Sequence, residues 1–217
     1  MKALWLAVFF GTLAWSAISP KDYPTWLLEV APAVIGLVLI AATYNRFRLT
    51  PLLYWLILAH CVVLMVGGHY TYAEVPLFDD LKPLFGWERN NYDKLGHFMQ
   101  GFVPAILARE ILVRKAVVTS NAWRNLFIVS VCLAFSAFYE LLEWWVAIAT
   151  GTASEAFLGT QGYIWDTQSD MFLALLGAIA ALATLARLHD RQMAALDDSL
   201  PGDSQKSGKI TILRPRG

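Results

Sequence analysis

Six long apolar blocks, separated by short polar connections, dominate the sequence. They span residues 3–18, 26–42, 51–68, 97–113, 126–150 and 171–188. A membrane-spanning helix needs about 20 apolar residues at ~1.5 Å of rise per residue, and a shorter block needs flanking side chains that reach the interface. The pattern therefore predicts an all-α fold, namely a polytopic membrane helix bundle with six transmembrane helices.

The composition supports a membrane protein and argues against several other classes. Hydrophobic residues make up 57% of the chain and charged residues only 16%, whereas a soluble domain carries about 25% charged residues. The 17 basic and 17 acidic side chains cancel, so we expect membrane lipids and no nucleic acid as partners. Cys61 and Cys132 fall inside apolar blocks, which predicts small buried side chains rather than a disulfide or a zinc site.

The first block, with Lys2 before it, has the charged start and apolar core of a signal peptide. Its cleavage chemistry is poor. If Ala17 were the last residue removed, Trp15 would stand where a small residue is required. We therefore expect an uncleaved first helix.

The basic residues predict the orientation of the bundle. With the N-terminus in the cytoplasm, Lys21, Lys82, Arg89 and Lys94 fall on the outer side. The other basic residues fall on the cytoplasmic side, and these are Lys2, Arg46, Arg48, Arg109, Arg114, Lys115, Arg124, Arg187, Arg191, Lys206, Lys209, Arg214 and Arg216. Cytoplasmic connections are enriched in Lys and Arg, so both termini are predicted to be cytoplasmic.

The connections divide the chain into a transmembrane domain and a tail. Residues 1–190 are predicted to form the six-helix domain, and residues 191–217 a flexible cytoplasmic tail. The outer connection at 70–92 contains PLFDDLKPLF, whose apolar residues recur at helical spacing. We expect a short interfacial segment there, broken by Pro83. The connection at 151–165 is rich in Gly and Thr.

Polar side chains stand at the start of the fourth block, in the stretch YDKLGHFMQG at residues 92–101. Asp93, His97 and Gln100 recur at helical spacing and so share one stripe of the helix. Asp93 is expected to act in part as a helix cap, and Lys94 to pair with a nearby acid. These residues are predicted to form one wall of a pocket.

The fifth and sixth blocks bring further carboxylates to the same depth. Glu140 and Glu143 lie in an otherwise apolar span. Counted from Leu126, Glu140 lies ~21 Å along the helix, within a bilayer hydrocarbon core that is ~30 Å thick. Asp166 and Asp170 open the sixth helix, where Asp166 is expected to act as a cap. Glu29 is expected at a comparable depth. A carboxylate within the hydrocarbon layer needs a partner, a cation or a proton, so these groups predict a polar pocket in the outer leaflet.

We interpret this pocket as a functional site. Its candidate catalytic residues are Glu140, His97 and Asp170. The candidate metal ligands are His97, Glu140, Glu143, Asp166 and Asp170, and the remaining expected pocket residues are Asp93, Lys94, Gln100, Gln161 and Trp165. Oxygen ligands with one imidazole suit a divalent cation such as Mg, Mn or Fe better than structural zinc.

Other polar residues of the apolar blocks have simpler interpretations. His60, alone near the middle of the third block, is interpreted as a satisfied core histidine. Arg109 and Glu110, near the inner end of the fourth block, are interpreted as an interfacial ion pair.

Four segments carry a family resemblance: HYTYAEVPLF (69–78), YDKLGHFMQGFVPAILARE (92–110), SAFYELLEWW (136–145) and FLGTQGYIWDTQSDM (157–171). They resemble the motifs of the YjdF family of bacterial inner-membrane proteins, which implies a multi-pass protein of the bacterial inner membrane and supplies no reaction. A fainter similarity to VanZ-like proteins rests on the Asp-Lys-x-x-His helix start. Tyr163 stands where the YjdF-type motif has an acidic residue.

Three functions fit these features. The first is an enzyme at the outer face that acts on an amphiphile, such as a lipid-linked envelope precursor, with a cation or acid–base carboxylates. The second is a proton-coupled transporter, for which intramembrane Glu and His residues are typical. The third is a structural or accessory protein whose buried acids only hold helices together. Because the polar residues gather in one leaflet, we rank a non-transporting outer-leaflet site first. No hydrolase or metalloprotease motif is present, so the sequence leaves its reaction open.

Overall fold

The computed structural model describes residues 2–150 and 160–197, which form seven α-helices and the turns between them. The helices are α1 (Lys2–Ser16), α2 (Tyr23–Thr43), α3 (Pro51–Tyr70), α4 (Pro76–Phe85), α5 (Tyr92–Arg114), α6 (Asn121–Thr150) and α8 (Asp166–Asp197). The described part of the chain is thus all-helical, as the sequence predicts. The predicted connection at 151–159 and the predicted tail at 198–217 lie outside the described residues.

Each of the six predicted long helices is present, with changes at its ends. α5 begins at Tyr92 rather than at residue 97, so the polar stretch forms the first turns of the helix itself. α8 continues to Asp197, beyond the predicted start of the tail at residue 191. Of the helices described, α2, α3, α6 and α8 are long and apolar enough to cross a membrane. α1 is apolar but has only 15 residues, and polar side chains interrupt α5.

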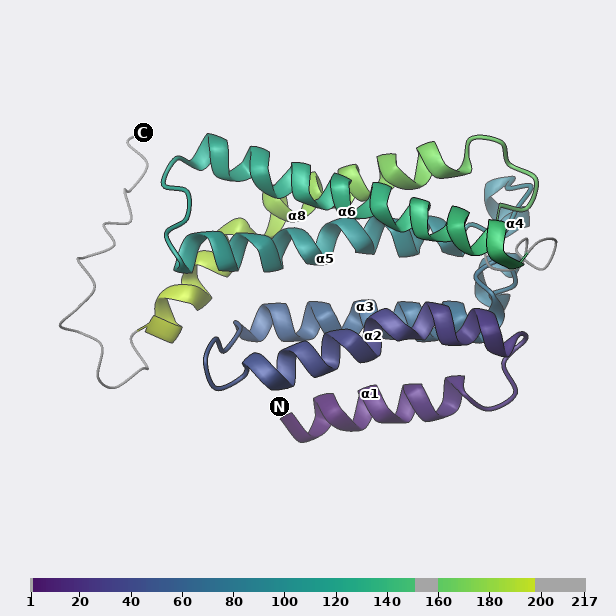
Figure 1. The fold of residues 1–217 in the computed structure, drawn as a ribbon, viewed down its shortest axis with the longest axis horizontal. Coiled ribbons are helices and arrows are strands. Elements are labelled where there is room, and N and C mark those ends of the chain that lie inside the picture. The colour runs from purple at the N-terminus through teal and green to yellow at the C-terminus, as the bar shows by residue number, and fades with distance from the viewer. Residues whose placement is uncertain (1, 151–159, 198–217) are drawn as a thin grey trace.

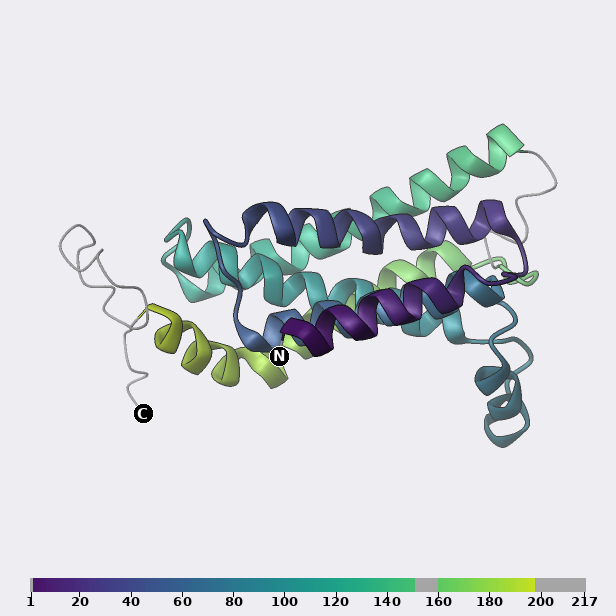
Figure 2. The ribbon, with the colours of Figure 1, turned by 90° about the horizontal axis from the view of Figure 1, so that it is seen from below.

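Consecutive long helices run in opposite directions along the bundle, and they form two groups of three (Figure 1). One group contains α1, α2 and α3, and the other contains α5, α6 and α8, with α3 packed against α5 between them. α4 lies at one end of the bundle, where α2, α5 and α8 begin, and projects sideways from it (Figure 2). We call this end the α4 end and the opposite end the far end.

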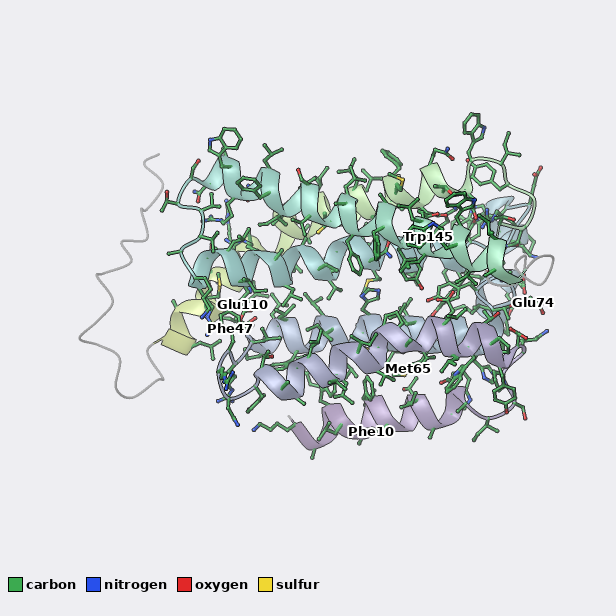
Figure 3. All side chains as sticks on the ribbon, viewed as in Figure 1. Phe10, Phe47, Met65, Glu74, Glu110 and Trp145 are labelled. Atoms are coloured by element: carbon green, nitrogen blue, oxygen red, sulfur yellow. The ribbon has the colours of Figure 1, made fainter. Side chains whose placement is uncertain are left out.

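The core and the surface are both apolar, as expected where lipid is the solvent. Phe9 and Met65 are fully buried between the helices. Phe10 and Trp145 point away from the bundle and are about half exposed, at 51% and 48% (Figure 3). A soluble bundle would not present rings of this size around its circumference.

Small residues let α5 and α8 approach more closely than any other pair that we describe. A methyl group added at Gly101 would lie 1.8 Å from the Ala174 carbonyl oxygen, and one at Gly177 would lie 2.1 Å from the Phe98 carbonyl oxygen. Close backbone packing at glycine is a general means of helix association in membranes. It brings the polar first turns of α5 and α8 into contact.

α4 confirms the predicted short segment in the 70–92 connection. Leu77, Leu84 and Phe85 are exposed on it, whereas Lys82 pairs with Asp79. The expected break at Pro83 is wrong, because the helix continues to Phe85 before it ends at Gly86. A proline near the end of a helix removes only one backbone hydrogen bond, which the last turn tolerates.

Candidate functional site

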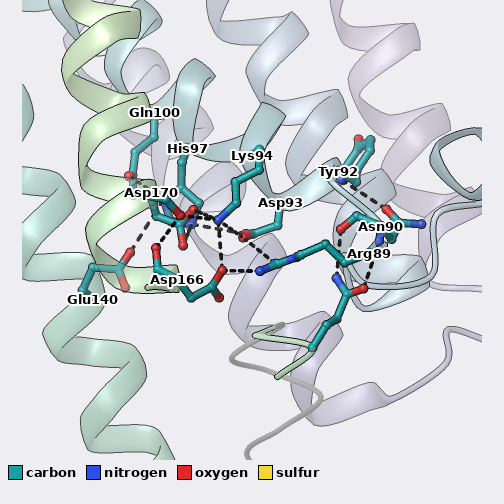
Figure 4. Close-up of polar contacts among 12 residues, drawn as sticks. Arg89, Asn90, Tyr92, Asp93, Lys94, His97, Gln100, Glu140, Asp166 and Asp170 are labelled. Carbon is teal, nitrogen blue, oxygen red and sulfur yellow. Dashed lines mark hydrogen bonds and ion pairs between the residues drawn. The ribbon is translucent and has the colours of Figure 1, made fainter. Parts of the chain in front are cut away.

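Three helices supply the polar side chains that meet at the α4 end (Figure 4). Asp93, Lys94, His97 and Gln100 come from the first turns of α5. Asp166 and Asp170 come from the first turns of α8, and Glu140 comes from α6. Residues widely separated in the sequence therefore converge, as predicted, and all seven are largely buried.

Lys94 is the main link between α5 and α8. Its Nζ donates to Asp166 Oδ1 at 2.9 Å, to Ser169 Oγ at 2.7 Å and to Asp170 Oδ1 at 2.7 Å. An ammonium group has three hydrogens, so these three bonds use its full donor capacity. The expectation that Lys94 pairs with a nearby acid is confirmed.

Arg89 supplies a second cation that the sequence interpretation did not assign to the site. It precedes α5, and its Nη1 lies 2.5 Å from Asp166 Oδ1 while its Nη2 lies 3.7 Å from Asp93 Oδ2. Its position four residues before Asp93 was the available signal, since that spacing places the two side chains on one side of a helical turn.

His97 lies at the centre of the carboxylates. Its Nε2 is 3.2 Å from Asp93 Oδ1 and 3.9 Å from Asp170 Oδ2, and its Nδ1 is 3.3 Å from Gln100 Oε1 and 3.8 Å from Glu140 Oε1. The imidazole is buried, with 6% of the residue exposed. His97 therefore faces carboxylates from α6 and α8 as well as one from its own helix.

Two carboxylate oxygens in this cluster are buried and lack a hydrogen-bond partner among the described residues. They are Glu140 Oε1 and Asp93 Oδ2, and each of these residues is only 8% exposed. A buried polar atom without a partner costs free energy comparable to a lost hydrogen bond or more, and a charged one costs most. These oxygens are therefore suited to accept a proton or to bind a cation.

The geometry offers two overlapping sets of metal ligands that share His97. One set is Asp93, His97 and Asp170, and the other is His97, Glu140 and Glu143. Within each set, one ligand atom from each residue lies within 4.8 Å of the others. Asp166 was predicted as a ligand, but its carboxylate is engaged by Arg89 and Lys94 and belongs to neither set.

A cavity of about 60 Å³ adjoins this cluster. It lies between α2, α3, α5 and α6, and its wall contains both polar and aromatic side chains. The lining residues are Glu29, Pro32, His60, Leu64, Tyr72, Asp93, Gly96, His97, Gln100, Phe135, Tyr139 and Glu143. His60, interpreted from the sequence as a satisfied core histidine, is therefore part of the cavity wall.

Tyr72 reaches the cavity from the turn after α3. Thr71 and Tyr72 both have a left-handed backbone, with φ of 59° and 55°. The Tyr72 ring packs against Gly67 and Gly96, where an added methyl group would come within 2.2 and 2.9 Å of ring atoms. Burial, followed by the negative charge of Glu29, raises the pKa of the Tyr72 phenol well above its usual range, so it remains a hydroxyl donor. The sequence interpretation missed Tyr72 and Tyr139.

The expected capping roles of the two aspartates are wrong. The residue at the N-cap of α5 is Asn91, without a side-chain capping bond, and Asp93 instead contacts His97. Asp166 is the first residue of α8, and its Oδ1 binds Arg89 and Lys94. Asp93 is engaged by His97 of its own helix, and Asp166 by cations from an earlier part of the chain, because charge-assisted bonds are stronger than a neutral capping bond.

Three of the predicted pocket residues lie outside the cavity wall: Lys94, which bonds to the neighbouring acids, Gln161 and Trp165. Gln161 accepts a hydrogen bond from the Asn90 backbone N–H and donates one to the Asn90 carbonyl oxygen, both at 2.9 Å. Trp165 is 58% exposed.

A second buried polar cluster, which we call the far-end cluster, occupies the opposite end of α5 and α8. Glu110 accepts hydrogen bonds from Thr50 N, Thr50 Oγ1, His189 Nε2 and Arg114 Nη1 at 2.8–3.0 Å. Arg109 donates to His189 Nδ1 at 3.2 Å and to Asp190 Oδ1 at 2.7 Å. The interpretation of Arg109 and Glu110 as a pair is wrong, because adjacent residues on a helix do not face each other.

Comparison with known proteins decides the family. The family model described as "Predicted membrane protein (DUF2238)" matches residues 1–191. The chain belongs to the DUF2238 family. The chain is also similar to the inner membrane protein YjdF of Escherichia coli strain K12, with 54% identity over 181 residues that cover 83% of this chain and 87% of the relative. No solved structure gives a significant match.

These findings confirm two predictions from the sequence. The resemblance to the YjdF family holds for this DUF2238 protein over most of the chain. The predicted localisation holds as well, because the E. coli relative is an inner membrane protein and several helices of the present chain are long and apolar enough to cross a membrane.

Proposed function

We propose that this protein binds a hard divalent cation in a carboxylate–histidine pocket at the outer leaflet of the inner membrane, and that the pocket acts on an amphiphilic envelope molecule. The observation that carries the proposal is the pair of buried carboxylate oxygens without hydrogen-bond partners, on Glu140 and Asp93, on opposite sides of His97. A cation bound by His97 Nδ1, Glu140 and Glu143 would satisfy the Glu140 oxygen, and a cation bound instead by His97 Nε2, Asp93 and Asp170 would engage the Asp93 carboxylate.

The charges around the pocket favour a cation over a purely structural network. The carboxylates of Glu29, Asp93, Glu140, Glu143, Asp166 and Asp170 gather there, and the cationic side chains that reach them are Arg89 and Lys94. Acids this close repel each other unless protons or cations join them. Carboxylate oxygens with a single imidazole are the ligands that suit Mg, Mn or Fe.

Such a cation would polarise a bound water or a substrate oxygen. His97, Glu140 and Asp170 are the residues that we assign to hold it and to move protons beside it. Lys94 orients Asp170 through a hydrogen bond of 2.7 Å, which keeps that carboxylate directed toward His97.

The distribution of polar groups favours a site open to one face over a transporter. The far-end cluster is the second polar region, but apolar residues separate it from the cavity. On α5 the buried residues between Gln100 and Arg109 include Val103 and Ile106, and on α8 Ala174, Ala178 and Ala181 are fully buried between Asp170 and His189. A transport path through these layers would need polar groups at those positions.

For the topology we propose six membrane crossings, with the α4 end outside and both termini in the cytoplasm. The distribution of basic residues supports this orientation, since the far end carries the basic residues around Arg48 and Arg114. α1 packs against α3 as a full member of the bundle. α5 lies between α3, α6 and α8, where partner helices shield its polar face from lipid.

The test measures Mn²⁺ binding by the purified protein, after treatment with a chelator, by the electron paramagnetic resonance signal of free Mn²⁺. We expect the wild type to bind Mn²⁺, and Glu140→Gln to weaken binding by about 10-fold or more, since it removes one ligand charge while keeping the shape. Glu74→Gln is the matched control, because Glu74 is half exposed at the same end and pairs with Lys21. Wild-type protein that binds no more Mn²⁺ than Glu140→Gln contradicts the proposal.

A further inference from the structure

One side of the cavity takes no part in either set of candidate metal ligands. It is formed by Glu29 of α2, Tyr72 of the turn after α3, and Tyr139 of α6. Glu29 is 5% exposed, and Tyr139 Oη lies 3.5 Å from Glu29 Oε2. We call this the Glu29 side of the cavity.

The chemistry of the Glu29 side matches a positively charged group. Glu29, Asp93 and Glu143 line the cavity, and Asp93 contributes a buried oxygen that lacks a hydrogen-bond partner. The rings of Tyr72 and Tyr139 stand beside these acids, and aromatic faces attract cations. Neither Arg89 nor Lys94 lines the cavity, and the three hydrogens of Lys94 are already bonded. An anionic group would therefore meet the carboxylates of Glu29, Asp93 and Glu143, and of these Asp93 has cations beside it, Arg89 at 3.7 Å and Lys94 at 3.9 Å, which lie outside the cavity wall.

The charge of the whole cluster leaves room for this group in addition to a divalent cation. The six carboxylates around the pocket exceed the two cationic side chains, Arg89 and Lys94, by more than one divalent ion neutralises. A second positive charge near Glu29 reduces the remaining excess.

The size of the cavity limits what that group is. The cavity volume of about 60 Å³ is several times the ~10–15 Å³ needed to hold one water molecule, so the cavity accommodates a small polar group. A primary ammonium fits such a space and donates hydrogen bonds to carboxylates. A trimethylammonium group is bulkier and has no N–H to donate.

The cavity also reaches the surface that faces lipid. Phe135 of α6 lines the cavity and is 51% exposed, and Pro32 of α2 lines the cavity beside it. The neighbouring surface is apolar, with Val131 56% exposed and Leu28 38% exposed. An amphiphile can thus place its polar group at the Glu29 side while its acyl chains stay against α2 and α6.

We propose that the cavity binds the protonated primary amine of an outer-leaflet aminolipid, such as a lipid with an ethanolamine headgroup, which enters between α2 and α6. The inference rests on the proposed function, in that it names the class of amphiphile for the same pocket. It adds Glu29 and Tyr139 as the residues that select the headgroup.

The experiment compares lipids of identical acyl chains by native mass spectrometry of the purified protein. Phosphatidylethanolamine offers a primary amine, phosphatidylcholine a quaternary one, and phosphatidylglycerol none. We expect the wild type to retain phosphatidylethanolamine about 5-fold or more over both of the others. Glu29→Gln should reduce this preference to near unity, and Tyr139→Phe should weaken it, while Glu74→Gln should preserve it.

Each outcome decides between alternatives. Equal retention of the three lipids by the wild type, or a preference for phosphatidylglycerol, overturns the proposal. If free ethanolamine competes as well as the lipid does, the ligand is a soluble amine and the aminolipid assignment is overturned. If Glu29→Gln fails to fold, Tyr139→Phe and the wild-type lipid comparison still decide.

Measuring Mn²⁺ on the same samples separates this inference from the proposed function. Glu29 lies outside both sets of candidate ligands, so Glu29→Gln should still bind Mn²⁺ and should weaken that binding clearly less than Glu140→Gln does. Lipid selectivity without Mn²⁺ binding would leave the amine site standing and contradict the cation site. Mn²⁺ binding without lipid selectivity would support the cation site and contradict the amine site.

Discussion

Lys94 on α5 and Asp170 on α8 are joined by a hydrogen bond of 2.7 Å between Nζ and Oδ1. The same Asp170 presents its other oxygen, Oδ2, to His97 Nε2 at 3.9 Å. One carboxylate therefore both ties two helices together and faces the candidate cation site. Because Lys94 also holds Asp166 and Ser169, the helix–helix link does not depend on Asp170 alone, and the two roles can be separated.

Asp170→Asn is the variant that separates them. The change keeps the shape of the side chain and removes its charge. We expect the variant to insert and fold, and the weakened bond to Lys94 to lower the free energy of unfolding by at most about 3 kcal/mol. We expect its affinity for Mn²⁺ to fall by about 10-fold or more. Thermal unfolding in detergent with and without Mn²⁺ measures both effects. If Mn²⁺ raises the unfolding temperature of Asp170→Asn as much as that of the wild type, Asp170 only links the two helices and does not bind the cation.

Gly101→Ala tests the close packing that assembles the site. The added methyl group would lie 1.8 Å from the Ala174 carbonyl oxygen, so the backbones of α5 and α8 must separate. Forcing extra atoms into a packed interface costs about 1–3 kcal/mol or more. We expect a lower midpoint of thermal unfolding and weaker Mn²⁺ binding.

Gly36→Ala is the control for that substitution. Gly36 lies within α2, and nothing stands within 4 Å of the position that its methyl group would take. Alanine favours a helix over glycine by about 1 kcal/mol, so this variant should be as stable as the wild type or more so. Equal effects of the two substitutions would contradict the packing explanation.

Glu110→Gln should destabilise the bundle without affecting the pocket. Glu110 is fully buried, and the donors of Thr50, Arg114 and His189 all point at its carboxylate. Breaking a buried charge network costs about 3–5 kcal/mol, because the remaining charges lose their partner. Mn²⁺ affinity should stay unchanged, since Glu110 lies ~20 Å along α5 from His97.

Asp190→Asn provides the comparison at the same end. The Asp190 side chain is half exposed and pairs with Arg109. Its partner Arg109 is buried but keeps its hydrogen bond to His189 when Asp190 is neutralised, so this variant should still unfold close to the wild-type temperature. If Glu110→Gln also unfolds there, the far-end cluster contributes little to stability.

Reporter fusions test the proposed topology. Fusions after Arg48 and within residues 115–120 should report the cytoplasm, and fusions after Gly86 and Gly162 should report the outside, because basic residues concentrate at the far end. Alkaline phosphatase and a fluorescent protein give opposite signals on the two sides. A cytoplasmic signal at Gly86 would place the pocket in the inner leaflet.

The helices, and the set of polar residues expected to meet, follow from the amino-acid sequence alone. Lipid as solvent forces backbone hydrogen bonds to be satisfied within each segment, so apolar length alone predicts the helices. A carboxylate in an apolar span is costly without a partner, so Glu140 and Asp170 indicated a shared pocket before any contact was known.

The pairing of these polar groups follows from the packing of the helices in three dimensions. Lys94 binds Asp166 and Asp170, and Arg89 binds Asp166 as well. Glu110 does not pair with Arg109 but accepts hydrogen bonds from Thr50 and His189. The packing also brings Tyr72 and Tyr139 to Glu29, where the sequence offered no signal. Pairing depends on the rotation and separation of neighbouring helices, which glycine contacts such as that of Gly101 with Ala174 set, and a one-dimensional pattern does not contain those distances.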